Sequence, residues 1–309
     1  MKQRAVPCSH RALRYLAPNL ITLASLLFGI LSIGESLQGR FIDAGWFTVF
    51  AVLTDKLDGW VARLVHGESE LGVQLDSFAD FLNFGIAPAT LWYAFFSHWD
   101  GGPFASGIGR DVLIGACVVW VLAVTFRLAR FNIVGNDPSC DRIFFGVPTT
   151  LQGGMLMALF LACLKYSNPA IATGAGGHFE DVGLFGGVSL EPVLRAWPAL
   201  MLGGAFLMAS AVRIPKLKRA RSRGLTIFIF LNVIAGYAFG FARVLPEYLA
   251  IVSGLWIGIS IVWGQVSPEA RALRPPRIFP SVAPEERPYA EDDLEDLEDL
   301  EPAQDLDAA

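Results

Sequence analysis

The sequence predicts an all-α fold, a multispanning transmembrane helical bundle with about eight spans and both termini in the cytoplasm. Of the 309 residues, 53% are hydrophobic and only 17% are charged. The mean hydropathy is positive, and apolar runs of about 20 residues, the length needed to cross a bilayer, recur along the chain. This composition is typical of a membrane protein and argues against a soluble domain.

The apolar runs divide the chain into eight predicted spans. They lie at about 18–36, 41–64, 72–96, 112–133, 147–166, 192–212, 225–242 and 245–264. The basic segment 1–17 lacks a small-residue cleavage site, so we expect a cytoplasmic lead-in rather than a cleaved signal peptide. A glycine-rich external loop, 167–190, separates spans one to five (18–166) from the C-terminal spans (191–266). The proline-containing, acidic tail 267–309 is expected to be disordered in the cytoplasm.

Basic residues orient the predicted bundle, because cytoplasmic loops are enriched in Lys and Arg. One side receives the basic N-terminus, Arg63, the segment with Arg127 and Arg130, and the run 213–223, whereas the other side has only scattered charges. The first side is therefore expected to be cytoplasmic. The run 213–223 is expected to anchor the chain at anionic lipid headgroups. It has no interleaved aromatic residues, so we expect no nucleic-acid partner.

Four carboxylates lie at the junction of the second and third predicted spans. One helix face carries Asp55, Asp58, Gly59 and Ala62, and one face of the next helix carries Gly72, Asp76, Asp80 and Asn83. Carboxylates at such a depth are energetically costly unless something neutralises them, so they indicate a functional site. Hard divalent cations such as Mg²⁺ and Mn²⁺ prefer carboxylate oxygens. The aspartates therefore predict a cation site facing the cytoplasm.

The spacing of these residues, D-x2-D-G-x2-A-R-x8-G-x3-D-x3-D, closely resembles the signature of the CDP-alcohol phosphotransferases, integral membrane enzymes of phospholipid synthesis. All eight specified positions are present: Asp55, Asp58, Gly59, Ala62, Arg63, Gly72, Asp76 and Asp80. The resemblance implies that 18–166 is a catalytic core, which transfers a phosphatidyl group from a CDP-linked lipid to an alcohol.

The resemblance also implies roles for single residues. Asp55, Asp58, Asp76 and Asp80 would bind two Mg²⁺ or Mn²⁺ ions, and Asp80 would be the catalytic base that accepts the proton of the alcohol. The residues expected to bind the CDP-linked lipid are Asn19, Thr22, Gly59, Ala62, Arg63 and Gly72. Taken without the resemblance, the small residues predict only close helix packing, and Arg63 could equally pair with Glu68 or Glu70.

Three stretches resemble the phosphatidylserine synthase branch of this family, which couples CDP-diacylglycerol to L-serine. They read PNLIT at 18–22, LDSFADFLNFGIAP at 75–88 and RLARFN at 127–132. Arg127 and Arg130 either bind the carboxylate of serine or simply mark the end of a span. With Asn83, they are the expected acceptor-binding residues. One turn departs from the branch, in which Gly-Leu/Val-Pro-x-Pro is usual, because this chain has Gly-Val-Pro-Thr-Thr at 146–150.

The expected partners are CDP-diacylglycerol, L-serine and membrane lipids, with the oligomeric state left open between a monomer and a homodimer. The expected location is the bacterial inner membrane, as a multi-pass protein. One alternative keeps the chemistry but uses inositol, glycerol phosphate or choline as the acceptor. Another is a cation-coupled transporter, although the C-terminal half of the sequence has no second acidic hairpin.

Overall fold

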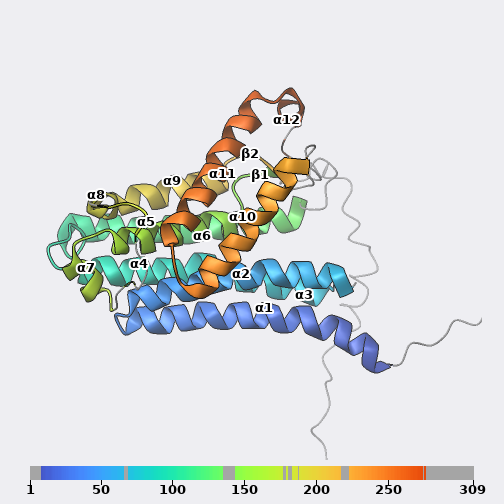
Figure 1. Cartoon of the computed structure of the whole chain (residues 1–309), viewed down its shortest axis with the longest axis horizontal. Coiled ribbons are helices and arrows are strands. Elements are labelled where there is room, and N and C mark those ends of the chain that lie inside the picture. Colours follow the sequence, from blue (N-terminus) through green and yellow to red (C-terminus); the bar gives the residue numbers. More distant parts are fainter. Residues whose placement is uncertain are drawn as a thin grey trace, which may run out of the picture. The chain divides into compact units, whose positions relative to one another are not determined.

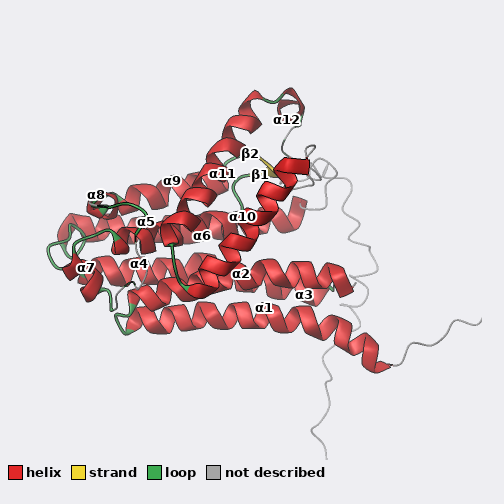
Figure 2. Cartoon of the chain, in the orientation of Figure 1, coloured by secondary structure: helices red, strands yellow, loops and turns green. Residues whose placement is uncertain are grey.

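Helices make up nearly all the regular structure of this chain (Figure 2). The structure is a computed structural model, and it describes residues 8–65, 69–134, 143–176, 179, 183–186, 188–216, 223–273 and 275. All the described elements belong to one compact unit, Met1–Pro276. The helical class predicted from the sequence is thus confirmed.

The main helical segments form one bundle, in which most lie roughly side by side while the last two long helices run obliquely to the others (Figure 1). The main segments are α1 (Cys8–Leu37), α2 (Phe41–Val65), α3 (Glu70–Asp80), the π-helical segment η1 (Phe81–Ile86), α4 (Ala87–His98), α5 (Gly107–Val134), α6 (Thr149–Lys165), α9 (Trp197–Ala209), α10 (Arg223–Ala242) and α11 (Pro246–Val266). Short helices α7 (Pro169–Gly174), α8 (Glu191–Arg195) and α12 (Pro268–Ala272) complete the set. Helix α2 packs between α1 and α6, and α5 packs against α4 and α9.

Three of the described helical segments are long and apolar enough to cross a membrane: Leu16–Leu37, Gly107–Val134 and Pro246–Val266. Thr149–Lys165, Trp197–Ala209 and Thr226–Ala242 are apolar but shorter. Helix α2 has 25 residues but carries Asp43 and Arg63 as well as the candidate aspartates. The described helices therefore support a membrane protein, while the count of eight spans stays a prediction.

The predicted and the observed helices differ at two prolines. Helix α1 begins at Cys8 and continues through Pro18, which lacks an N–H group and removes one backbone hydrogen bond without ending the helix. The predicted sixth span is instead divided into α8 and α9 at Ala196. Pro198 in the first turn of α9 cannot continue the hydrogen-bond ladder of α8.

A two-stranded sheet connects the start of α6 with the segment after α9, and the all-α prediction missed it. Strand β1 (Ile143–Phe145) pairs antiparallel with β2 (Arg213–Pro215), so that Phe144 lies opposite Ile214. The next residues are held in the same way, since Gly146 N donates to Val212 O at 2.7 Å and Val147 N donates to Leu207 O at 3.2 Å. The beginning of α6 is thereby fixed to the end of α9.

An aromatic core holds α4, α5, α6 and α9 together. The rings of Trp92 and Trp120 lie 5.2 Å apart, and those of Trp92 and Trp197 lie 5.6 Å apart. Phe160 of α6 contacts Trp197 at 5.5 Å, and all four of these side chains are fully buried. Large buried aromatic groups dominate the energetics of such a core, which gives the helices carrying the aspartates a rigid support.

Candidate metal and lipid site

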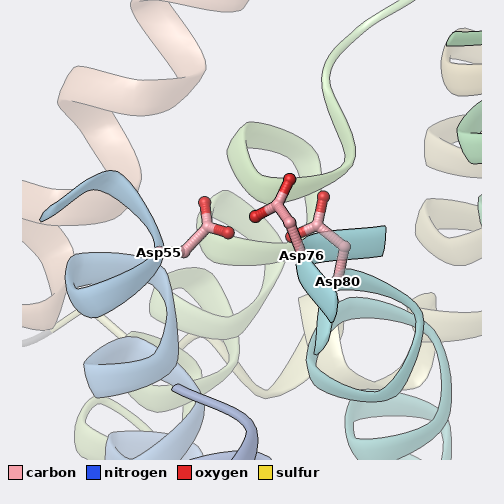
Figure 3. A group of neighbouring side chains, drawn as sticks. All are labelled: Asp55, Asp76 and Asp80. Atoms are coloured by element: carbon pink, nitrogen blue, oxygen red, sulfur yellow. The ribbon is translucent and has the colours of Figure 1, made fainter. Parts of the chain in front are cut away.

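Three aspartates converge between the C-terminal half of α2 and the C-terminal half of α3. Asp55 comes from α2, whereas Asp76 and Asp80 lie one helical turn apart on α3. Their side chains point toward one another (Figure 3), and one carboxylate oxygen from each lies within 4.8 Å of the others. The side chain of Ser69 caps α3 by accepting a hydrogen bond from Gly72 N at 3.0 Å. The cap sets where α3 begins and hence which of its faces meets α2.

The donor set of this cluster fits a hard divalent cation. Three carboxylates in such proximity repel one another unless a cation balances them or some become protonated. Asp80 is buried, and its Oδ1 atom has no hydrogen-bond partner within the described residues. A buried carboxylate oxygen without a donor calls for a ligand. Asp55, Asp76 and Asp80 could hold Mg²⁺ or Mn²⁺, both of which favour such oxygens.

Asp58, the fourth predicted metal ligand, lies beside this group of three. It is buried, and its Oδ2 atom accepts a hydrogen bond from Thr22 Oγ1 of α1 at 2.8 Å. Thr22 Oγ1 also lies 3.1 Å from the carbonyl oxygen of Pro18. Helix α1 thus braces Asp58, which faces the cavity next to the three aspartates.

This cavity has a volume of about 230 Å³ and lies between α1, α2 and α3. All six residues expected to bind the CDP-linked lipid line it, together with two of the aspartates: Pro18, Asn19, Thr22, Asp58, Gly59, Ala62, Arg63, Ser69, Gly72, Val73 and Asp76. Six of the eight signature residues thus line one cavity beside the three clustered aspartates.

The two glycines of the signature serve this cavity differently. A Cβ atom on Gly72 would lie 3.0 Å from Asn19 Oδ1 and 3.1 Å from Ser69 Oγ, so Gly72 permits close packing of α3 on α1. A Cβ atom on Gly59 would meet only Arg63 Nη1, at 3.7 Å. Gly59 therefore leaves space that a ligand can use, whereas Gly72 has a packing reason of its own.

Arg127 is a buried cation near the aspartates. Its side chain is only 7% exposed, and the carboxylates of Asp80 and Asp55 are close enough to attract it. Its guanidinium lies over the ring of Phe131, 5.1 Å from the centroid. No hydrogen bond joins it to a protein atom in the described ranges. A buried guanidinium in this state suits an anionic ligand.

Arg130, one turn further along α5, is engaged with the backbone. Its guanidinium donates to the carbonyl oxygens of Phe145, Met208, Ala209 and Ser210, at 2.5 to 3.1 Å. These carbonyls belong to β1 and to the end of α9, where helical carbonyl groups lack partners. A Cβ atom on Gly146, whose φ is +84°, would lie 2.4 Å from Arg130 Nη2. Arg130 therefore caps α9 and ties it to β1.

Asn83 lies in η1, one turn beyond Asp80, and is directed toward α1. Its Nδ2 atom donates to Ser25 Oγ at 2.9 Å, and Ser25 Oγ donates to Ala51 O of α2 at 3.1 Å. A π-helical turn is rare and often found near functional sites. Here it follows directly after Asp80 and places Asn83 in a polar contact between helices.

Two residues near the aspartates were missed by the sequence analysis. Thr150 of α6 donates its hydroxyl to Asp55 Oδ2 at 3.3 Å. Tyr237 of α10 donates to Leu53 O, two residues before Asp55, at 3.2 Å. Thr150 lies at the turn that departs from the usual pattern, so that departure was the available signal. Tyr237 is far away in the sequence, and no motif marked it.

Comparison with known proteins gives a consistent result. The sequence model of the CDP-alcohol phosphatidyltransferase family matches residues 15–179. The chain is 30% identical over 248 residues to a CDP-diacylglycerol–serine O-phosphatidyltransferase of Helicobacter pylori, and the match covers 80% of this chain and 90% of the relative. It is 31% identical to the Bacillus subtilis enzyme of the same name, over 52% of this chain and 82% of the relative. An archaetidylserine synthase of Methanothermobacter thermautotrophicus is 32% identical, over 47% of this chain and 57% of the relative.

Proposed function

Because this chain belongs to the CDP-alcohol phosphatidyltransferase family, we propose that it transfers the phosphatidyl group of CDP-diacylglycerol to the hydroxyl group of L-serine. The products are phosphatidylserine and CMP. The observation that carries this proposal is the meeting of Asp55, Asp76 and Asp80 beside the 230 Å³ cavity. The names of the relatives from Helicobacter pylori and Bacillus subtilis favour serine as the acceptor.

The cavity between α1, α2 and α3 is the proposed site for the cytidine diphosphate group. Gly59 leaves room for it, and Arg63 lines the same hollow and can pair with a phosphate oxygen. Divalent ions, held by the aspartates, would neutralise the diphosphate and the charge that develops on the departing CMP. Asp58, held by Thr22, would complete the set of carboxylates from the edge of the cavity.

Asp80 is the proposed base for the serine hydroxyl. The hydroxyl oxygen forms a new bond to the phosphorus that carries the diacylglycerol, and the bond from this phosphorus to the oxygen of CMP breaks. The hydroxyl proton goes to a carboxylate at hydrogen-bond distance. Asp80 meets this need best, because its Oδ1 atom is buried and has no donor in the part of the chain that the structure describes.

Arg127 is the proposed partner of the serine carboxylate. Serine differs from inositol and choline in carrying a carboxylate, which needs a fixed cation. The guanidinium of Arg127 is buried near Asp80 and bonds no protein atom within the described ranges. Arg130 and Asn83, also predicted to bind the acceptor, already bond α9, β1 and α1. We therefore assign them to positioning these elements.

The proposed setting is the bacterial inner membrane, with eight spans, both termini in the cytoplasm and the aspartates facing the cytoplasm. The long apolar helices support a membrane location. The orientation depends on the basic residues, because Arg63, Arg127, Arg130 and Lys216 would lie at cytoplasmic ends. CDP-diacylglycerol would then reach the cavity from the bilayer, and serine would reach it from the cytoplasm.

The test is an acceptor panel. Purified protein is mixed with CDP-diacylglycerol, Mg²⁺ or Mn²⁺, and one of L-serine, inositol, glycerol phosphate or choline, and CMP release is followed. We expect release to depend on L-serine, to stop in excess chelator and to be lost in the Asp76→Asn variant. CMP release with inositol or choline but not with serine would contradict the acceptor. Full activity in chelator would contradict the role of the cations.

A further inference from the structure

We propose that Thr150 is a positioning residue that holds the carboxylate of Asp55 in its cation-binding orientation. This inference rests on the proposed function, because it assigns a task to a residue beside the same aspartates. It concerns the position at which the chain departs from the Gly-Leu/Val-Pro-x-Pro turn. Proline has no side-chain donor, so the departure places a hydroxyl where the usual residue has none.

The contact is made between two helices of fixed register. Thr150 is 6% exposed and lies in the first turn of α6, where its Oγ1 atom donates to Asp55 Oδ2 at 3.3 Å. One helical turn further along α6, a Cβ atom on Gly154 would lie 3.1 Å from Val52 Cγ2 of α2. Near the other end of the two helices, a Cβ atom on Gly45 would lie 2.7 Å from the side chain of Leu161.

These contacts form one antiparallel seam between α2 and α6. Small residues along it bring the two backbones close, and close packing prevents one helix from sliding past the other. Thr150 and Asp55 are the polar pair at the end of this seam. The start of α6 is also fixed to the end of α9, because Val147 N donates to Leu207 O at 3.2 Å. The hydroxyl is therefore presented to Asp55 from a rigid support.

A threonine hydroxyl suits this task chemically. As a neutral donor it leaves the charge of Asp55 intact for a cation, and it uses only part of the acceptor capacity of the carboxylate. The β-branched side chain has few rotamers in a helix, so its hydroxyl is already oriented. Hydrogen-bond partners of this kind orient metal ligands, and their loss typically weakens metal binding about 10–100-fold.

The same arrangement occurs at the other signature aspartate of α2, Asp58. Asp58 accepts from Thr22 of α1 at 2.8 Å, and Asp55 accepts from Thr150 of α6 at 3.3 Å. Helix α2 thus has one threonine on each flank, and each holds one aspartate.

The neighbouring residue supplies a matched control. Thr149 lies in the same turn and is 1% exposed, but its Oγ1 atom has no hydrogen-bond partner in the described part of the chain. Thr149→Val and Thr150→Val make the same change of hydroxyl to methyl at adjacent buried positions. Thr150→Ser keeps the hydroxyl and removes the methyl group.

The experiment measures Mn²⁺ binding to the detergent-purified protein without substrates, by electron paramagnetic resonance. We expect Thr150→Val to raise the Kd for Mn²⁺ about 10–100-fold. The Kd of Thr150→Ser for Mn²⁺ should stay within a few-fold of the wild-type value, and the Kd of Thr149→Val should equal the wild-type value. The lost turnover of Thr150→Val should largely return at saturating Mn²⁺, with an unchanged melting temperature.

A wild-type Kd for Mn²⁺ in Thr150→Val would overturn the inference, as would equal weakening in Thr149→Val. The result of this Mn²⁺-binding test can be distinguished from the result of the acceptor panel that tests the proposed function. If the wild type ignores serine while Thr150→Val still binds Mn²⁺ weakly, the acceptor is wrong and the positioning role stands. If serine is consumed and Thr150→Val binds Mn²⁺ normally, the function stands and Thr150 has no such role.

Discussion

At the scale of single residues, Asp80 combines two features that a general base needs. It lies among the other carboxylates of the site, and its Oδ1 atom is buried without a donor in the described ranges. We expect Asp80→Asn to bind CDP-diacylglycerol nearly as the wild type does and to turn over about 10²–10⁴-fold more slowly. The measurement is steady-state CMP release with a separate lipid-binding assay. Recovery of a near-normal rate at saturating Mn²⁺ would show that Asp80 is only a ligand.

Arg127 permits a sharper test of the acceptor. Replacement by lysine keeps the charge but loses the planar fork that matches a carboxylate. We expect Arg127→Lys to raise the KM for serine more than that for CDP-diacylglycerol, with a loss of roughly 1.5–3 kcal/mol, the value of a charged hydrogen bond. Arg63→Lys is the control, because Arg63 lines the lipid cavity and should affect the KM for CDP-diacylglycerol. If Arg127→Lys leaves the KM for serine unchanged, Arg127 does not bind the carboxylate of serine.

Residue types and spacing predicted much of the composition of this site but not which contacts each residue makes. Helical periodicity placed Asp55, Asp76 and Asp80 on facing helices, and the structure brings them together. Periodicity could not show that Asp58 turns toward the cavity, because that depends on Thr22 of another helix. Nor could it separate Arg127 from Arg130, since the difference is set by carbonyl groups at the end of α9.

At the scale of elements, α6 and α11 are joined by a buried ion pair. Glu247 accepts from Lys165 Nζ at 3.0 Å, from Tyr166 Oη at 2.8 Å and from Leu184 N at 3.1 Å. The side chains of Lys165 and Glu247 are only 5% and 2% exposed. Removal of Glu247 takes from the buried ammonium group of Lys165 a carboxylate 3.0 Å away, and breaking a buried ion pair typically costs about 3–5 kcal/mol.

We therefore expect Glu247→Ala to lower the melting temperature in detergent markedly. The control is Glu191→Ala, which removes the exposed pair with Arg195 at 2.8 Å and should change little, because such helical pairs are worth about 0.3–0.5 kcal/mol. Equal melting temperatures for Glu247→Ala and the wild type would mean that water already solvates Lys165.

The elements themselves were predictable to the extent that they follow local patterns. Apolar runs gave the positions of α2, α5 and α6 within about five residues, whereas the third predicted span, 72–96, is divided into α3, η1 and α4. The sheet of β1 and β2 was not predictable in this way, because its strands are short and far apart in the sequence. The π-helical turn after Asp80 also has no local signal, since it depends on how α1 and α5 pack around Asn83 and Phe84.

At the scale of the whole molecule, the orientation in the membrane is the main prediction to test. The predicted external loop includes His178, which lies outside the described residues, so Thr173 of α7 is the better probe. Ala211, next to the sheet, is exposed on the predicted cytoplasmic side. Single cysteines are introduced at these positions in a variant without the four native cysteines.

An impermeant thiol reagent should label Thr173→Cys in intact cells and Ala211→Cys only after the membrane is opened. The reason is that Lys and Arg hold their ends of the spans in the cytoplasm. Labelling of both positions from outside, or of Ala211→Cys alone, would contradict the predicted orientation or the number of spans.

The ion pair between α6 and α11 also bears on biogenesis. Glu247 is synthesised 82 residues after Lys165, which at a typical rate of about 5–20 residues per second is a delay of roughly 4–16 s. During that interval α6 carries a buried ammonium group that still lacks the carboxylate of Glu247. The arrival of α11 supplies this carboxylate, so the last of the long described helices to be translated stabilises the helix that also carries Thr150 beside the clustered aspartates. Ribosomes stalled before codon 247 should therefore hold a nascent enzyme whose α6 is still sensitive to membrane quality control.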